Sequence, residues 1–79
     1  MAKWILYHTQ GCHLCEQAKQ LIAPLLSADS SLALIDIMTD DKLIEEYQVS
    51  IPVLKNEQGQ RLYWPFTAQH VQAFLAKTE

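Results

Sequence analysis

The chain has 79 residues, a length that fits one small domain, and we expect a single domain over residues 1–79. Hydrophobic residues make up 49% of the chain, which is enough for a core and too many for a disordered protein. The formal net charge is −3 and the six basic residues are scattered, so the composition predicts no nucleic-acid partner.

The sequence also gives no sign of a membrane or secretory segment. No stretch is apolar over the roughly 18 residues that a membrane helix requires. Residues 1–6 lack the long apolar segment and the small-residue cleavage site of a secretory signal. We therefore expect a soluble cytoplasmic protein with no membrane partner, in a compartment that keeps most thiols reduced.

The first half of the chain has the pattern of a strand, a helix and a second strand. Lys3–His8 is nearly continuous in apolar residues, which is typical of a buried strand. After a break at residues 9–11, the apolar residues recur with the period of a helix. The apolar side of this helix is predicted to contain Leu14, Cys15, Ala18, Leu21, Ile22, Leu25 and Leu26. Pro24 should kink or end the helix near residue 26, and Leu32–Ile37 is predicted as the next buried strand.

The second half predicts a short helix, a β-hairpin and a last helix. Residues 39–41 can cap the short helix, and the third strand begins at Ile51. Residues 56–59 form the hairpin turn, Arg61–Trp64 is the fourth strand, and Thr67 caps the last helix. A βαβ unit followed by ββα implies a parallel strand pair, an antiparallel hairpin and an α/β fold.

The only two cysteines, Cys12 and Cys15, lie at the start of the first predicted helix. A structural disulfide between them would close a very short loop and would stabilise the fold by only roughly 2 kcal/mol on the chain-entropy rule. A Cys-x-x-Cys pair in a βαβ context is instead typical of a redox site. The pattern therefore favours thiol–disulfide exchange over a structural cross-link.

The two cysteines are expected to have different roles. Cys12 stands at a helix N-terminus, where free amide groups and the helix dipole favour a thiolate, which is the reactive form. Cys15 lies one turn further along, on the apolar side, where burial favours the thiol. We therefore predict that Cys12 attacks a disulfide and that Cys15 resolves the mixed disulfide.

Pro52 is the second part of the predicted site. Proline donates no hydrogen bond to a sheet, so within a strand it is tolerated only at an edge or at the start. A cis bond between Ile51 and Pro52 would leave the neighbouring backbone free to pair with an extended substrate. A trans proline that merely starts a strand is equally compatible with the local sequence.

Two segments resemble the glutaredoxin family. Residues 7–19 (Tyr-His-Thr-Gln-Gly-Cys-His-Leu-Cys-Glu-Gln-Ala-Lys) are similar to its active-site helix, and residues 49–53 (Val-Ser-Ile-Pro-Val) to the strand that carries its cis-proline. The resemblance covers the whole chain and implies a thioredoxin-like fold of the glutaredoxin type, βαβαββα, with a four-stranded mixed sheet and helices on both faces. It also implies Cys12 as the nucleophile, Cys15 as the resolving thiol and a cis Pro52. The residues expected to contact the substrate are Gly11, His13, Leu14, Ile51, Pro52 and Trp64.

The sequence departs from the glutaredoxin pattern where that family binds glutathione. Glutaredoxins usually have Pro-Tyr between the cysteines, whereas this chain has His13 and Leu14, and Thr9 replaces a common basic residue. Residues 63–67 are bulky and uncharged where the family carries a Gly-Gly pair. We therefore expect protein or small-molecule disulfides as partners and no cofactor, with glutathione at most a co-substrate.

Two other functions stay open at this point. Cys12 of two chains could share a zinc ion or an iron–sulfur cluster, although His8 and His70 have no partner at a metal-ligand spacing and we assign no metal ligand. The chain could also be an adaptor that keeps the fold without catalysis. We expect a monomer. Absorbance above 400 nm in freshly purified protein would indicate a cluster, and an adaptor would keep its cellular role after Cys12→Ser.

Overall fold

Four strands form one mixed sheet in the computed structural model, which describes residues 3–77. The sheet order is β2-β1-β3-β4. Strand β1 (Lys3–His8) lies parallel to β2 (Ser31–Asp36) and antiparallel to β3 (Val53–Lys55), which in turn pairs antiparallel with β4 (Arg61–Tyr63). The parallel pair and the antiparallel hairpin predicted from the sequence are therefore confirmed.

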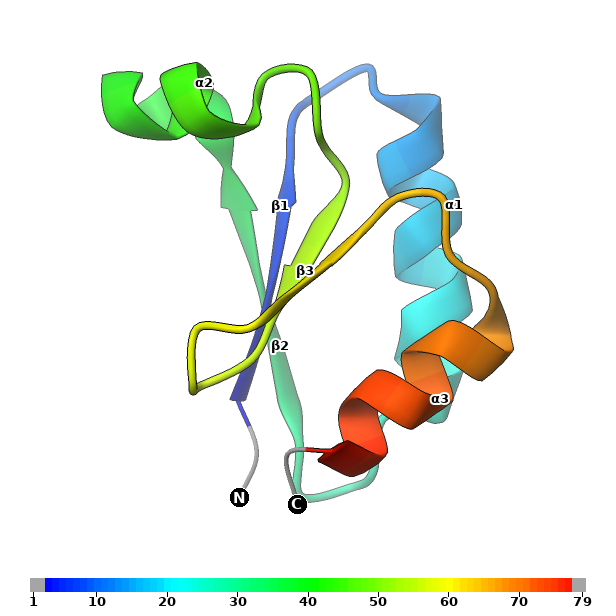
Figure 1. The fold of residues 1–79 in the computed structure, drawn as a ribbon. Coiled ribbons are helices and arrows are strands. Elements are labelled where there is room, and N and C mark those ends of the chain that lie inside the picture. Colours follow the sequence, from blue (N-terminus) through cyan, green and yellow to red (C-terminus); the bar gives the residue numbers. More distant parts are fainter. Residues whose placement is uncertain (1–2, 78–79) are drawn as a thin grey trace.

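Three α-helices cover the two faces of the sheet. They are α1 (His13–Ile22), α2 (Asp41–Tyr47) and α3 (Ala68–Lys77). Figure 1 shows α1 and α3 together on one side of the sheet, with α2 on the other side at the end where β1 runs into α1. The element order is βαβαββα, which is the α/β order predicted from the sequence. Within residues 3–77, no helix has the length and hydrophobicity needed to cross a bilayer.

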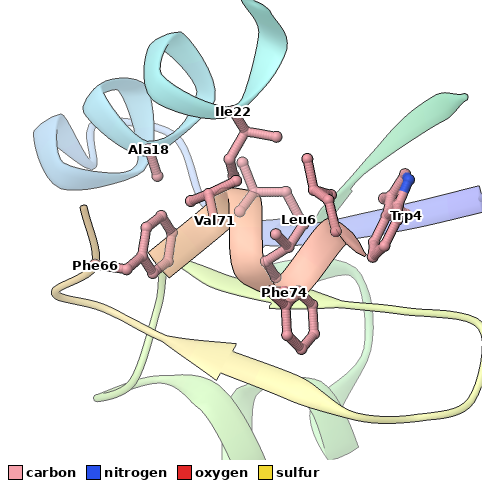
Figure 2. Packing of buried hydrophobic residues seen from close by; sticks show 9 residues of the cluster. Trp4, Leu6, Ala18, Ile22, Phe66, Val71 and Phe74 are labelled. Atoms are coloured by element: carbon pink, nitrogen blue, oxygen red, sulfur yellow. The ribbon is translucent and has the colours of Figure 1, made fainter. Parts of the chain in front are cut away.

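The alternation of β1 divides the core into two clusters. Trp4 and Leu6 point toward α1 and α3, where side chains from both helices pack over the sheet (Figure 2). This larger cluster consists of Trp4, Leu6, Ala18, Ile22, Leu54, Phe66, Val71, Phe74 and Leu75. Tyr7 points to the other face, where a smaller cluster consists of Tyr7, Ile37, Tyr47 and Val53. Successive residues of β1 therefore bury against different helices, as expected for a central strand.

Four predicted strand boundaries differ from the structure. β2 begins at Ser31 instead of Leu32, and β4 ends at Tyr63 instead of Trp64. The sequence predicts that the second strand reaches Ile37, but a 3₁₀ turn begins there, because the Asp36 carboxylate accepts a hydrogen bond from the Met38 amide at 2.9 Å. This short element, η2, spans Ile37–Thr39. The third strand begins at Val53 and not at Ile51. A side chain that competes for backbone donors therefore ends β2 one residue early.

The start of α3 follows the predicted signal, whereas α1 ends before the predicted position near residue 26. α1 ends at Ile22, and the 3₁₀ turn η1 (Ala23–Leu25) that contains Pro24 follows it. The Thr67 hydroxyl accepts a hydrogen bond from the His70 amide at the start of α3, and His70 Nδ1 accepts one from the Thr67 amide, both at 3.2 Å. The predicted cap at Thr67 is confirmed, and His70 completes it in the manner of a capping box.

One predicted core position of α1 is wrong. The helical period predicts Leu14 on the apolar side of the helix, yet 45% of its surface is exposed. It lies in the first helical turn, beyond the end of β1, where no other element covers it. Its exposure leaves an apolar side chain in solvent between the two cysteines.

The β3–β4 hairpin is closed by one buried asparagine. Asn56 is 3% exposed, and its amide side chain accepts a hydrogen bond from the Gln60 backbone and donates one to the Gln60 side chain, both at 2.9 Å. Gly59 has a φ of 86°, a left-handed conformation that favours glycine, within the turn predicted at residues 56–59. These bonds fix the hairpin turn while leaving Glu57 and Gln58 exposed.

Candidate redox site

A short turn at residues 9–11 carries the chain from β1 into α1. Gly11, just before the first cysteine, has a φ of 78°, which side chains other than glycine rarely tolerate. A Cβ atom added to Gly11 would meet no atom within 4 Å. The turn therefore requires glycine because of its backbone conformation and not because a side chain would clash. This conformation places Cys12 at the N-cap of α1.

Cys12 and Cys15 form a disulfide at the N-terminus of α1. Their Cα atoms are 5.2 Å apart. Cys12 is the N-cap residue, and its sulfur accepts a hydrogen bond from the Cys15 amide at 3.1 Å. Cys12 is half-buried, whereas Cys15 is only 4% exposed. The structure therefore separates an accessible sulfur bonded to a helix amide from a buried one.

His13 and Leu14 both face solvent beside this disulfide. The His13 side chain is 92% exposed, and its Nδ1 atom lies 3.9 Å from a carboxylate oxygen of Glu16. Leu14 presents its apolar surface in the same turn. These two residues form an open rim around Cys12 and do not cover it.

The strand register brings Pro52 to the same end of the sheet as the cysteines. Tyr7 pairs with Val53, so the residue after Tyr7 in β1 and the residue before Val53 lie side by side where β1 leads into the cysteine turn. The Ile51–Pro52 peptide bond is cis. The Pro52 side chain is fully buried, so the ring itself offers little surface to a substrate.

The backbone next to Pro52 is only partly free. The Ile51 amide donates a hydrogen bond to the Tyr47 carbonyl at 3.1 Å, and the Pro52 carbonyl accepts one from the Trp64 amide at 3.3 Å. Within residues 3–77, no hydrogen bond to the Ile51 carbonyl is found. The amide and the carbonyl of Ile51 therefore differ, because only the amide is bonded within the described part of the chain.

Trp64 is held against this segment from the β4 side. Besides its backbone bond to Pro52, its indole packs edge-on against Phe66, with ring centroids 5.0 Å apart and planes at 76°. Phe66 belongs to the buried core. The Trp64–Pro65 bond is also cis, which the sequence did not predict. The aromatic residues that replace a Gly-Gly pair are thus anchored in this position by the core.

A network on the α2 face also supports the segment before Pro52, and the sequence did not indicate it. Tyr47, at the end of α2, stacks on Tyr7 with ring centroids 4.4 Å apart and accepts a hydrogen bond from Arg61 Nε at 2.7 Å. The same arginine lies 3.3 Å from a Glu46 carboxylate oxygen. The Tyr47 carbonyl accepts hydrogen bonds from the amides of residues 50 and 51. Tyr47 thereby connects β1 and β4 to the Pro52 segment.

Ionisation of Tyr47 gives a pH-dependent test of this network. Burial raises the pKa of the Tyr47 hydroxyl above its usual value of 10.0, although the hydrogen bond from Arg61 acts in the opposite direction. The unfolded chain therefore loses this proton at a lower pH than the folded protein, so the stabilising effect is complete below pH 10 and is lost as the pH rises through the folded pKa. We expect the free energy of unfolding of the oxidised protein to fall more steeply above pH 10 than that of Tyr47→Phe. Urea titrations at several pH values measure this free energy for both proteins. An equally steep fall above pH 10 in the wild type and in Tyr47→Phe would contradict the expectation.

The described residues hold no obvious metal centre. Within residues 3–77, no group of three or more His, Cys, Asp or Glu side chains is placed to bind a metal ion. His8 ends β1, whereas His70 lies in the first turn of α3, where its ring nitrogen completes the helix cap.

The chain is similar to one protein family and to the solved structures of another protein. The model of the family described as Glutaredoxin-like domain (DUF836) matches residues 3–76. An X-ray structure of the Northeast Structural Genomics target protein XcR50 from X. campestris is 32% identical, with a TM-score of 0.84 over 94% of this chain and 96% of that one. A solution structure of XcR50 is 34% identical, with a TM-score of 0.82 over 98% and 95% of the two chains. None of the curated proteins compared with the chain matches it. The similarity to XcR50 thus extends over nearly the whole of both chains.

Proposed function

Because this chain belongs to the glutaredoxin-like domain family, we propose that it is a thiol–disulfide oxidoreductase that acts in the cytoplasm on disulfides of proteins or small molecules. The observation that carries the proposal is the asymmetric Cys12–Cys15 pair at the start of α1. One sulfur is accessible and bonded to a helix amide, and the other is buried within one turn of it.

The proposed reaction moves two electrons from the protein to a substrate disulfide. The Cys12 thiolate attacks one sulfur of the substrate, which breaks the substrate S–S bond and releases the other half as a thiolate. Cys15 then attacks the Cys12 sulfur of the mixed disulfide, releases the second substrate thiol and leaves the Cys12–Cys15 disulfide. The Cys15 thiol proton and one proton from solvent pass to the two leaving thiolates, and an external thiol reductant restores the reduced pair.

Alkylation of the reduced protein tests the assignment of roles. Helix N-termini lower the pKa of cysteine thiols below the free value of about 8.5, so we expect Cys12 to react with iodoacetamide well below that pH and faster than Cys15. Peptide mapping after short exposures across a pH series measures both rates. Preferential labelling of Cys15, or a Cys12 rate that rises only as for free cysteine, would contradict the assignment.

Glutathione is expected to be a poor substrate compared with a protein disulfide. Its two carboxylates need backbone donors or cations nearby, whereas Trp64 and Phe66 fill the adjoining region and Pro65 has no amide hydrogen. Charge-assisted hydrogen bonds contribute about 1.5–3 kcal/mol each, so the loss of two or three would weaken binding by well over tenfold. The free amides at the start of α3 can offset part of this loss.

The measurement compares kcat/KM for a glutathione mixed disulfide with that for a protein disulfide under the same reductant. A mixed disulfide in which both glutathione carboxylates are esterified provides the control, because it removes the charges and keeps the tripeptide. We expect the esterified mixed disulfide to be reduced faster than the mixed disulfide of unmodified glutathione. The hypothesis is wrong if the mixed disulfide of unmodified glutathione is reduced as efficiently as the protein disulfide.

A further inference from the structure

A surface cleft runs from the disulfide along the side of α1 that faces β2. Its volume is about 260 Å³, and both Cys12 and Cys15 line it. Leu6 and Leu34 also line it, and Glu16 and Lys19 line it from α1. Of the substrate contacts predicted from the sequence, Gly11 lines the cleft, whereas Pro52 and Trp64 do not.

Leu34 gives this cleft an exposed apolar surface. It pairs with Leu6 in the β1–β2 register, so both side chains point to the face covered by α1 and α3. Leu32, two residues earlier on the same face, packs against the core there, whereas Leu34 is 41% exposed. β2 is an edge strand, and among the described residues Leu32 but not Leu34 packs against the core cluster on this face. A large apolar side chain is therefore left uncovered beside the disulfide.

The size and charge of the cleft define what it can hold. Ligand pockets for whole small molecules usually measure about 300–1,000 Å³, so a cleft of about 260 Å³ suits a single side chain better. The lining is mixed, because Leu6 and Leu34 are apolar whereas His8, Thr9 and Gln10 are polar. The formal charges of Glu16 and Lys19, which also line the cleft, cancel. A neutral apolar group that covers Leu34 fits these features.

Because the cleft continues from the disulfide, its position indicates which molecule supplies the apolar group. Any group in the cleft lies next to Cys12, so during exchange it belongs to the molecule whose sulfur is bonded to Cys12. We propose that this cleft is a specificity pocket for an apolar side chain close to the reactive cysteine of a peptide or protein substrate. The inference rests on the proposed function and names the substrate feature that the site selects.

The test uses peptide disulfides that differ at one residue. Each peptide contains one cysteine, which is joined to a chromophoric thiol by a disulfide bond. Leucine or serine stands at one tested position, which is one of the two residues before this cysteine or one of the two residues after it. The reduced protein is expected to prefer leucine over serine by roughly tenfold in kcat/KM at one of these positions. Leu34→Ser should remove the preference by slowing the leucine peptide to the rate of the serine peptide, and Leu34→Met should keep it.

Two controls separate this effect from general damage. Met38→Ser changes a residue that is 63% exposed and does not line the cleft, so it should leave the preference unchanged. The small disulfide of 2-hydroxyethanethiol carries no apolar side chain, so the rate at which each variant reduces it is the baseline for that variant's peptide rates, and Met38→Ser should reduce it as fast as the wild type does. A urea titration establishes that each variant is folded.

The outcomes distinguish the pocket from the proposed function. If the wild type reduces every peptide but shows no preference for leucine, or if Leu34→Ser retains the preference, the specificity pocket is wrong and the oxidoreductase function stands. Equal slowing of all substrates by Leu34→Ser also contradicts the pocket. If the wild type reduces none of the disulfides, the proposed function itself fails.

Discussion

Replacing Cys12 by serine should abolish reduction of disulfides, with a loss on the order of a thousandfold or more, because the hydroxyl cannot form the mixed disulfide. Its sulfur is the accessible one and accepts the Cys15 amide hydrogen bond at the start of α1. The measurement is turnover of a protein disulfide under a fixed concentration of reductant.

The matched control is Cys15→Ser, which removes the buried sulfur. This variant should still attack a substrate disulfide through Cys12, and it should accumulate a mixed disulfide because nothing resolves it. Intact-mass spectrometry detects this species as the protein plus one substrate half. Accumulation of the same species by Cys12→Ser, and not by Cys15→Ser, would reverse the two roles.

Truncation of Leu54 should cause a large loss of stability while leaving the site residues intact. Leu54 is fully buried in β3, where it pairs with Leu6 on one side and Leu62 on the other. A buried leucine-to-alanine change costs about 2–5 kcal/mol, against a total stability of about 5–15 kcal/mol for an ordinary domain. Urea unfolding of the oxidised protein measures the difference.

Met38→Ala serves as the comparison, because Met38 is 63% exposed. Exposed positions of this kind usually change stability by less than about 0.5 kcal/mol. A cost for Leu54→Ala as small as that of Met38→Ala would show that β3 does not lie at the centre of the core.

Local patterns predicted most of the fold because each element carried its own signal. The apolar run of β1 and the helical period after Cys12 identified the crossover unit, and Thr67 marked the start of α3. The predictions were wrong where a single side chain or a single neighbouring element determines the local structure. The Asp36 carboxylate ends β2 early, and Leu14 is exposed because α1 begins beyond the sheet.

The parts of the site that the sequence did not indicate depend on pairings between distant strands. Arg61 reaches Tyr47 because β4 lies beside β3, and these two residues are 14 positions apart in the chain. Leu34 lines the cleft only because β2 is placed parallel to β1 with Leu6 as its partner. Neither contact has a periodic or motif signal, so neither could be predicted without the register.

The hairpin closed by Asn56 offers a point of attachment for engineered uses of this domain. β3 begins at the cysteine end of the sheet and runs away from it, so the turn at residues 56–60 lies at the other end, as Figure 1 shows. Exposed loop tips tolerate insertions well, and Gln58 is exposed between residues that hold the turn. A peptide tag inserted there would tether the protein to a bead or an electrode with its disulfide directed outward into solution.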